Sequence, residues 1–202
     1  MNRKLIILLV AILLPAATYA QQKASAFRFG VEWGAGSQFA SRYHYNYVQD
    51  TGFRIDDKDS RLCAALLGNV MGFAGVDVSE QLGLAIYGGV AGISADRQMI
   101  PILLRTRFYP SGCGSDGYFA FFDLGTDARS LISDSSILAD IGAGRRLALS
   151  KDIRLDFLLT LRTLQQTPVI TDPDYGTIIP AENIRVSYAG IYAIGLSISL
   201  EF

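Results

Sequence analysis

Residues 184–202, IRVSYAGIYAIGLSISLEF, decide the fold of this chain. The even-numbered positions run from Ile184 to Phe202 and are apolar or aromatic, with one glycine among them. The odd-numbered positions run from Arg185 to Glu201 and are small or polar, apart from Ile191. Because successive side chains of a strand point to opposite faces, this pattern predicts a β-strand with one apolar face.

Seven segments upstream alternate in the same way. They are residues 26–37, 62–78, 82–94, 100–109, 118–127, 137–149 and 153–164. In the first of them Phe27, Phe29 and Val31 fall on one face, whereas Arg28 and Glu32 fall on the other. After residue 20 no apolar run approaches the ~18 residues that a membrane-crossing helix needs. The sequence therefore predicts an all-β chain that forms a closed eight-stranded antiparallel up-and-down transmembrane β-barrel.

The connections between these segments fall into two classes. Residues 79–81, 110–117 and 150–152 are short polar turns. Residues 38–61, 95–99, 128–136 and 165–183 form longer links at the opposite end. Short turns at one end and longer loops at the other are typical of outer-membrane barrels. An even number of strands also brings both termini to the end with the short turns.

The charged residues indicate which way the apolar faces point. A soluble barrel of the lipocalin type would turn its apolar faces inward around a ligand. That interior would have to hold Trp33, Phe157 and Tyr188 with many leucines and isoleucines, which leaves no room for a ligand. We therefore expect the apolar faces to contact lipid and the charges to pair inside the lumen. The expected luminal charge network consists of Arg28, Glu32, Arg105, Arg107, Asp123, Asp140, Arg154, Asp156, Arg162 and Arg185.

Arg145 departs from this pattern, because its position in the alternation faces lipid. A charge costs about 2–4 kcal/mol at the bilayer midplane and about 0–1 kcal/mol near the interface. We expect either a bulge in this strand or a position of Arg145 close to the periplasmic interface.

The first twenty residues have the pattern of a secretory signal peptide. Arg3 and Lys4 precede the apolar residues 5–14, Pro15 breaks that run, and Ala20 ends a cleavage site of small residues. We expect residues 1–20 to be removed and residues 21–202 to form a single barrel domain. Lys and Arg number 18 and Asp and Glu number 19, and no basic cluster occurs, which argues against nucleic acid as a partner.

The signal peptide, the eight alternating segments, the short turns and the closing aromatic Phe202 together resemble the small outer-membrane β-barrel family. Its familiar members are the OmpA transmembrane domain and OmpX-type proteins. The resemblance covers residues 21–202, and the start at Gln21 and Gln22 is similar to barrels of Bacteroidetes-type bacteria. It implies a Gram-negative outer-membrane location with both termini in the periplasm. The partners that it implies are outer-membrane lipid, lipopolysaccharide and the barrel assembly machinery.

No constellation of residues predicts catalysis. His44 is the only histidine, and it lacks both a His-x-Ser pair and a matching acidic partner in a neighbouring strand. A single histidine does not predict a metal site. Cys63 and Cys113 are expected at opposite ends of the barrel, too far apart for a disulfide. We therefore expect no enzyme, no cofactor and two free thiols.

The first long link keeps the alternation of the strand before it, with Tyr43, Tyr45 and Tyr47 on one face. We hypothesise that strands one and two continue above the membrane as a protruding hairpin, beside the last link and its Tyr175. These four tyrosines are the candidate contacts for an extracellular protein or glycan. An outer aromatic girdle is the alternative interpretation. The favoured function is structural or cell-surface interaction; the other hypotheses are a narrow pore for solutes or ions and a lipid A-modifying enzyme.

Overall fold

A computed structural model describes residues 27–49, 51–94, 97–131, 135–172 and 175–202. The expected signal peptide lies outside these residues. The strands are β1 (Phe27–Val48), β2 (Arg54–Asp77), β3 (Leu82–Ser94), β4 (Arg97–Met99), β5 (Pro101–Phe108), β6 (Gly117–Asp127), β7 (Ser135–Ala148), β8 (Arg154–Thr167) and β9 (Ile184–Glu201). Two short 3-10 helices, η2 (Ala128–Leu131) and η3 (Ala181–Asn183), lie in the connections. No helix in the described part of the chain is long and apolar enough to span a bilayer.

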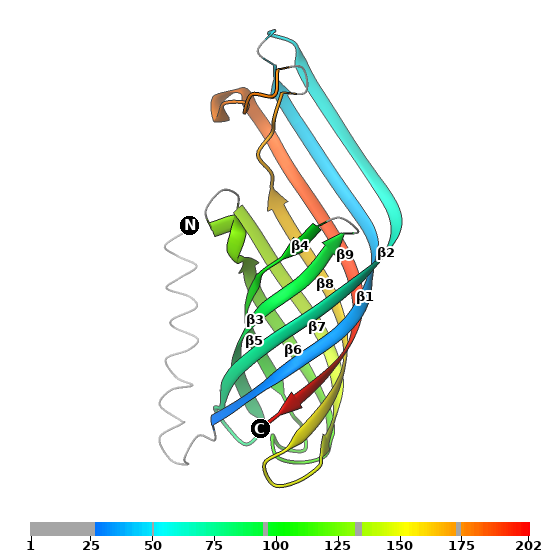
Figure 1. The fold of residues 1–202 in the computed structure, drawn as a ribbon, viewed down its shortest axis with the longest axis vertical. Coiled ribbons are helices and arrows are strands. Elements are labelled where there is room, and N and C mark those ends of the chain that lie inside the picture. Colours follow the sequence, from blue (N-terminus) through cyan, green and yellow to red (C-terminus); the bar gives the residue numbers. More distant parts are fainter. Residues whose placement is uncertain (1–26, 50, 95–96, 132–134, 173–174) are drawn as a thin grey trace.

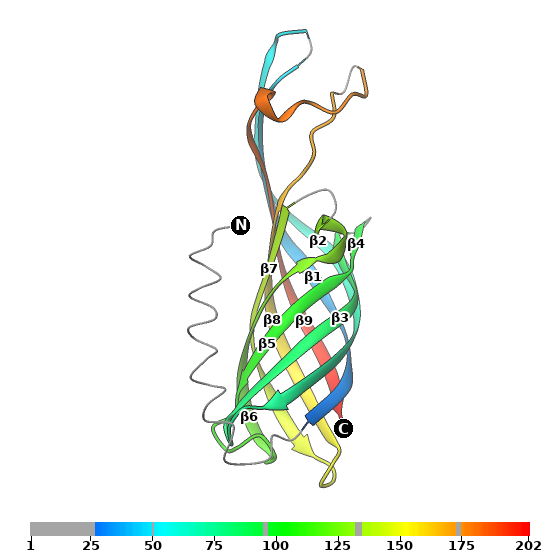
Figure 2. The same cartoon turned by 90° about the vertical axis from the view of Figure 1, so that its left-hand side faces the viewer.

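Antiparallel pairing joins the strands into one ring, in the order β2, β1, β9, β8, β7, β6, β5 and β3, and the pairing of β2 with β3 closes it. β4 and β5 together occupy one position in this ring, because β4 pairs with β3 around Gly92 and β5 pairs with it from Leu82 to Gly88. Between them, the amide of Ile100 donates to Oδ1 of Asp127 at 3.0 Å. The expected eight-stranded barrel is therefore confirmed, and Figure 1 and Figure 2 show it from two sides.

Alternation along each strand sorts the side chains between the outside and the lumen. In β1, Phe27, Phe29 and Trp33 are exposed, whereas Arg28 and Glu32 are buried. The same parity holds around the ring, so the outward face of the barrel is a continuous apolar belt. Its exposed members include Val70, Ile86, Ile102, Phe122, Ile141, Leu159 and Leu196. The expectation that the apolar faces point outward is confirmed.

The short turns lie at the lower end of the barrel in Figure 1, and two of them use the same device. In each, a serine Oγ accepts a hydrogen bond from the amide three residues later, at 3.0 Å for both Ser79 and Ser150. A serine hydroxyl can replace a backbone acceptor in a tight turn, which explains these reversals. The chain also ends at this rim, where Phe29 and Phe202 exchange two backbone hydrogen bonds and their rings stack at 5.7 Å.

Three strands, β1, β2 and β9, continue far beyond the others as an extension that we call the fin (Figure 1). It consists of residues 40–48 of β1, 54–62 of β2 and 184–192 of β9, with β1 in the middle. Residues 38–61 are therefore not a long loop, because β1 continues to Val48 and β2 begins at Arg54. The hypothesised protruding hairpin is present, and β9 adds a third strand to it.

A bulge at Phe39 changes which face each residue of β1 occupies. At this point β1 has one residue more than β9, since positions 38 and 40 pair with the consecutive positions 193 and 192. One extra residue reverses the alternation of a strand relative to its neighbour. Above the bulge, Tyr43, Tyr45 and Tyr47 therefore lie on the face that continues the lumen, although odd-numbered residues below it face outward.

Candidate functional site

The lumen contains a buried charge network with Arg105 at its centre. The guanidinium donates Nε and Nη2 to the two carboxylate oxygens of Asp123, at 2.8 and 2.7 Å, and Nη1 to Glu32 at 2.5 Å. The same group lies between the rings of Tyr87 and Phe121, with Cζ 4.2 and 4.4 Å from their centroids. A bidentate and stacked arginine has few alternative positions. Arg105 thus ties β1, β3 and β6 to its own strand, β5.

A second cluster of charges lies nearer the short turns. Arg146 forms two hydrogen bonds with Asp156, at 2.8 and 2.7 Å, and one with Glu201 at 2.8 Å. Arg107 approaches the same two carboxylates at 3.0 and 3.2 Å, and donates to the hydroxyl of Tyr109 at 3.2 Å. Two arginines therefore share two carboxylates. Buried charges are tolerated when they are paired and hydrogen-bonded in this way.

The turn that follows β5 closes the lower end of the lumen. Arg28 and Arg146 both donate to the backbone carbonyl of Cys113, at 3.1 and 2.6 Å. Arg28 also pairs with Glu201 at 2.6 Å. No sequence pattern could reveal this acceptor, because every residue carries a backbone carbonyl. The thiols of Cys63 and Cys113 are both free, as expected, and Cys113 is buried.

The structure brings nine of the ten expected network residues together in the lumen as ion pairs. Arg162 forms a bidentate bridge with Asp140, with a shortest distance of 2.7 Å, and Arg154 lies 3.6 Å from Glu201. Arg185 is the exception, because it is exposed in the fin and lies outside the network. The prediction that Arg185 lies in the lumen is therefore wrong. Positions 46 and 47 of β1 pair with positions 186 and 184 of β9, so position 185 is an extra residue at this point and the alternation of β9 is interrupted there.

Two tyrosines belong to the network although the sequence analysis did not single them out. The hydroxyls of Tyr87 and Tyr109 both accept hydrogen bonds from Arg107. Tyr87 directly follows the outward-facing Ile86 in β3, so it points inward. The alternation pattern contained the signal that identifies this residue.

An apolar layer lies in the lumen on the side of the longer links. Met71, Met99, Leu138 and Leu164 are buried there in one cluster. Beside Glu32 and the other polar residues below this layer, a cavity of about 40 Å³ remains, which has room for isolated waters but for no larger solute. Side chains therefore fill the lumen, as the width of an eight-stranded barrel leads one to expect.

The face of the fin that continues the lumen carries a packed cluster. Tyr47 is buried against Ile170 and Ile179 of the last loop. Tyr45 packs against this cluster, and its ring stacks on that of Tyr43 with 5.2 Å between the centroids. The described residues of the last loop, 168–172 and 175–183, therefore fold onto the fin, and Figure 2 shows them beside the ends of β1 and β2. Of the candidate contacts, Tyr47 has a packing role.

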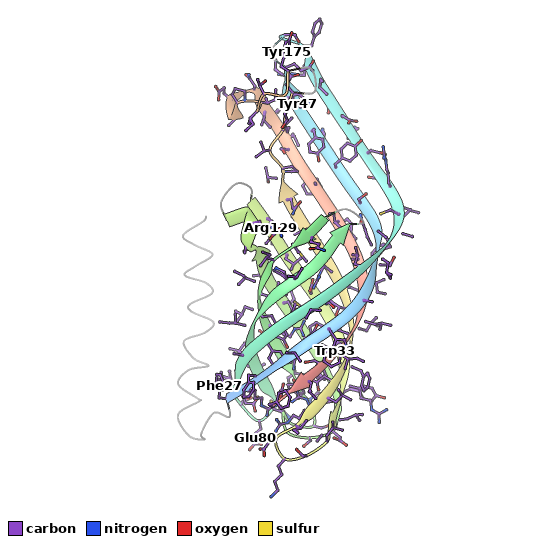
Figure 3. The ribbon with its side chains drawn as sticks, in the orientation of Figure 1. Phe27, Trp33, Tyr47, Glu80, Arg129 and Tyr175 are labelled. Atoms are coloured by element: carbon purple, nitrogen blue, oxygen red, sulfur yellow. The ribbon has the colours of Figure 1, made fainter. Side chains whose placement is uncertain are left out.

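Besides Leu62 at the base of the fin and Val169 in the last loop, the exposed large apolar side chains of the fin and its loop lie toward the tip. Phe53, in the turn between β1 and β2, is 73% exposed, and Tyr175 and Ile178 in the last loop are 62% and 69% exposed. Figure 3 places Tyr175 at the upper end of the molecule, above Tyr47. The structure thus leaves Tyr175 accessible and adds Phe53 and Ile178 to the accessible set.

The opposite face of the fin carries the histidine. His44 Nε2 lies 2.8 Å from Oδ1 of Asp56 in the neighbouring strand β2, and both side chains are partly exposed. The expectation that His44 has no acidic partner in a neighbouring strand is therefore wrong. The hydrogen bond from His44 lowers the pKa of Asp56 below the ordinary value of an aspartate. Ser41 is three positions from His44 in the same strand and faces the other side, so the two do not form a nucleophile–base pair. The described residues contain no group of three or more side chains that could hold a metal.

Arg145 lies on the outer face near the lower rim of the barrel. β7 pairs with β6 and β8 without a bulge there, and Arg145 is directly opposite Tyr118 and Phe157. Its Cζ lies 5.8 Å from the centroid of the Tyr118 ring, within the range of a cation–π contact. The strand ends three residues later, at Ala148. Of the two expected explanations, the bulge is wrong, and the place of Arg145 near the end of its strand is the one that the other explanation requires.

Comparisons with known proteins assign no family to this chain. No family model matches it, and no curated protein matches it. Among solved structures, the outer membrane protein OprG from Pseudomonas aeruginosa is similar, with a TM-score of 0.45 and 10% identity over 89% of this chain and 97% of that chain. The outer membrane protease OmpT from Escherichia coli is similar with a TM-score of 0.35 and 9% identity, over 90% and 97% of the two chains. A likeness at this level carries no argument, and neither protein's activity is transferred to this one.

Proposed function

We propose that this chain is an integral protein of a bacterial outer membrane. Its barrel anchors it in the membrane, and its fin binds a partner at the cell surface without catalysis. The proposal follows the resemblance to small outer-membrane barrels of the OmpA and OmpX type. Outer-membrane lipid surrounds the belt, with lipopolysaccharide on the side of the fin, and the barrel assembly machinery inserts the chain. Both ends of the barrel domain lie in the periplasm.

The apolar belt supports the membrane placement. Soluble monomers rarely expose a contiguous apolar patch beyond a few hundred Å², whereas this belt runs around all eight strands. A closed ring of strands also satisfies the backbone polar groups, which hydrocarbon requires. Aromatic side chains mark both edges of the belt, as at membrane interfaces: Phe27, Phe29 and Phe202 lie at the lower rim, and Phe39 and Tyr192 lie 6.5 Å apart near the upper one.

The fin supports the interaction role, and its exposed tip is the observation that carries the proposal. Packing of Tyr47 against the last loop gives the fin a defined shape. Phe53, Tyr175 and Ile178 nevertheless remain largely exposed at its far end. All three side chains gain free energy by burial, and two of them, Phe53 and Ile178, have no polar group that could form a hydrogen bond with a sugar. A protein partner is therefore favoured, and glycan binding is the other outcome of the test.

The test compares cells that display the wild-type chain with cells that display the triple variant Phe53→Ser, Tyr175→Ser and Ile178→Ser. Both are exposed to a panel of extracellular-matrix proteins and to a glycan array. We expect wild-type cells to bind a protein of the panel and the triple variant to lose that binding. The matched control changes Lys58→Gln and Glu182→Gln, which are exposed polar residues of the fin and its loop, and should bind as wild type. Full binding by the triple variant would contradict the proposal.

A narrow pore is the alternative function, and the filled lumen argues against it. Paired charges occupy the lower half, and the apolar layer around Leu138 and Leu164 lies above them. Planar-bilayer recordings of the purified chain test this alternative, and discrete conductance events would favour the pore.

A lipid A-modifying enzyme is the third hypothesis, for which His44 and Ser41 would have to act together across a strand. Mass spectrometry of lipid A from cells with and without the chain tests it.

A further inference from the structure

One charged residue, Arg145, interrupts the apolar belt as far as the structure describes it. Among the described residues that face outward along the apolar belt, Arg145 is the only charged one. No carboxylate among the described residues forms an ion pair with it, and its neighbour is the exposed ring of Tyr118. The donors of the guanidinium are therefore available to an anionic ligand at the lower rim.

Arg145 belongs to a row of directly paired residues that crosses five strands. The row consists of Tyr118 in β6, Arg145 in β7, Phe157 in β8, Ile198 in β9 and Trp33 in β1. Strands of a barrel tilt relative to its axis, so such a row climbs obliquely around the wall. It starts at the rim, one residue into β6, and reaches Trp33 six residues beyond the start of β1.

The next row of paired residues toward the fin has small side chains at two of its positions. Its paired residues are Ala143, Leu159, Leu196 and Ala35. The two alanines leave the outer surface hollowed between the larger side chains of the adjacent row, and these residues together line a groove. The groove leads from the charge at the rim into the apolar belt.

We propose that Arg145 and this groove bind one anionic phospholipid of the periplasmic leaflet, whose phosphate charge is not cancelled by a cationic headgroup as it is in phosphatidylcholine. The guanidinium holds the phosphate, because its planar fork matches two phosphate oxygens. One acyl chain lies along Ala143, Leu159 and Leu196 toward Trp33. The inference rests on the proposed membrane placement, which puts the lower rim at the level of the phospholipid headgroups. A bound phosphate also offsets the cost of a cation on the lipid-facing side.

The test uses Trp33, the only tryptophan of the chain, as a reporter at the far end of the groove. The full chain is folded into phosphatidylcholine vesicles that contain a minor fraction of phosphatidylglycerol with brominated acyl chains. Bromine quenches a tryptophan that it contacts, so the quenching measures how often the anionic lipid occupies the groove. Wild type is compared with Arg145→Gln, and Arg185→Gln removes an exposed arginine of the fin as the matched control.

We expect wild type and Arg185→Gln to show about five-fold enrichment of the anionic lipid over its mean fraction, the factor for ~1 kcal/mol from one arginine at an anionic lipid surface. Arg145→Gln should show none, while its gel mobility still shifts on heating as that of a folded barrel does. Equal quenching in wild type and Arg145→Gln would overturn the lipid site, as would loss of quenching on addition of inorganic phosphate. If Trp33 is not quenched even in fully brominated vesicles, the membrane placement itself is wrong.

Discussion

The substitution Arg105→Met should destabilise the barrel strongly. It removes the three hydrogen bonds to Asp123 and Glu32. Methionine keeps an apolar chain between the rings of Tyr87 and Phe121, so the packing there is largely retained. The change therefore isolates the charge: two buried carboxylates lose the cation to which they are directly bonded.

The expected loss follows from two independent figures. Removal of one partner from a buried ion pair costs about 3–5 kcal/mol. An unpaired buried carboxylate escapes its charge by taking up a proton, which costs an ordinary carboxylic acid about 4 kcal/mol at pH 7. We expect the free energy of unfolding to fall by about 3–5 kcal/mol at pH 7. The loss should be smaller at pH 5, because proton uptake is easier there.

Urea titration of the protein in phospholipid vesicles measures this loss, with the emission of Trp33 as the signal. The matched control is Arg185→Met, the same change at an exposed arginine, which should stay within about 0.5 kcal/mol of wild type. The double variant Arg105→Met/Asp123→Leu should regain part of the loss, because one unpaired carboxylate is gone. A loss below about 1 kcal/mol for Arg105→Met, or an equal loss in the control, would refute the stabilising role of the network.

Three further predictions concern the fin and the thiols. Tyr47→Ala should leave the heat-dependent gel shift intact but speed proteolysis within residues 168–183, because the last loop loses its packing partner. In the folded protein a maleimide should modify Cys63 but not the buried Cys113, and without reductant the unfolded chain should take up two adducts by mass spectrometry. The Asp56 carboxylate should titrate below the ordinary aspartate pKa in an NMR experiment, and His44→Gln should move it back up. Since the folded-state pKa is lowered, the stabilisation is present at neutral pH and disappears as the pH falls through that value.

The belt and most of the lumen could be predicted from alternation alone. Regular strands preserve parity over their whole length, so Arg28 in β1 and Arg146 in β7 reach the lumen without any knowledge of their partners. The pairing of those charges depends on strand register, which a list of alternating residues does not contain. The role of the Cys113 carbonyl as an acceptor is harder still to predict, because the path of the turn determines where this carbonyl points.

The fin was foreseen as a hairpin, but its faces were not. The sequence analysis extends the alternation of β1 unchanged through residues 38–47. In the structure, the bulge at Phe39 reverses which face the odd-numbered residues occupy. Arg185 was misplaced for the same kind of reason, an irregularity between β1 and β9. Bulges leave no fixed mark in composition, so sequence reasoning fails locally where pairing slips by one residue. The third strand of the fin and the folding of the last loop onto Tyr47 also depend on contacts between distant segments.

The bulge at Phe39 also allows one continuous strand to meet two different packing requirements, one in the barrel wall and one in the fin. Below it, the odd-numbered residues of β1 face outward along the belt. Above it, the odd-numbered residues occupy the other face and pack against the last loop. A single inserted residue absorbs the difference in phase between the two patterns. The alternation of the fin can therefore differ from that of the barrel wall although the two share one continuous strand. Deleting Phe39 would couple the two halves again and turn the tyrosine face of the fin away from its loop.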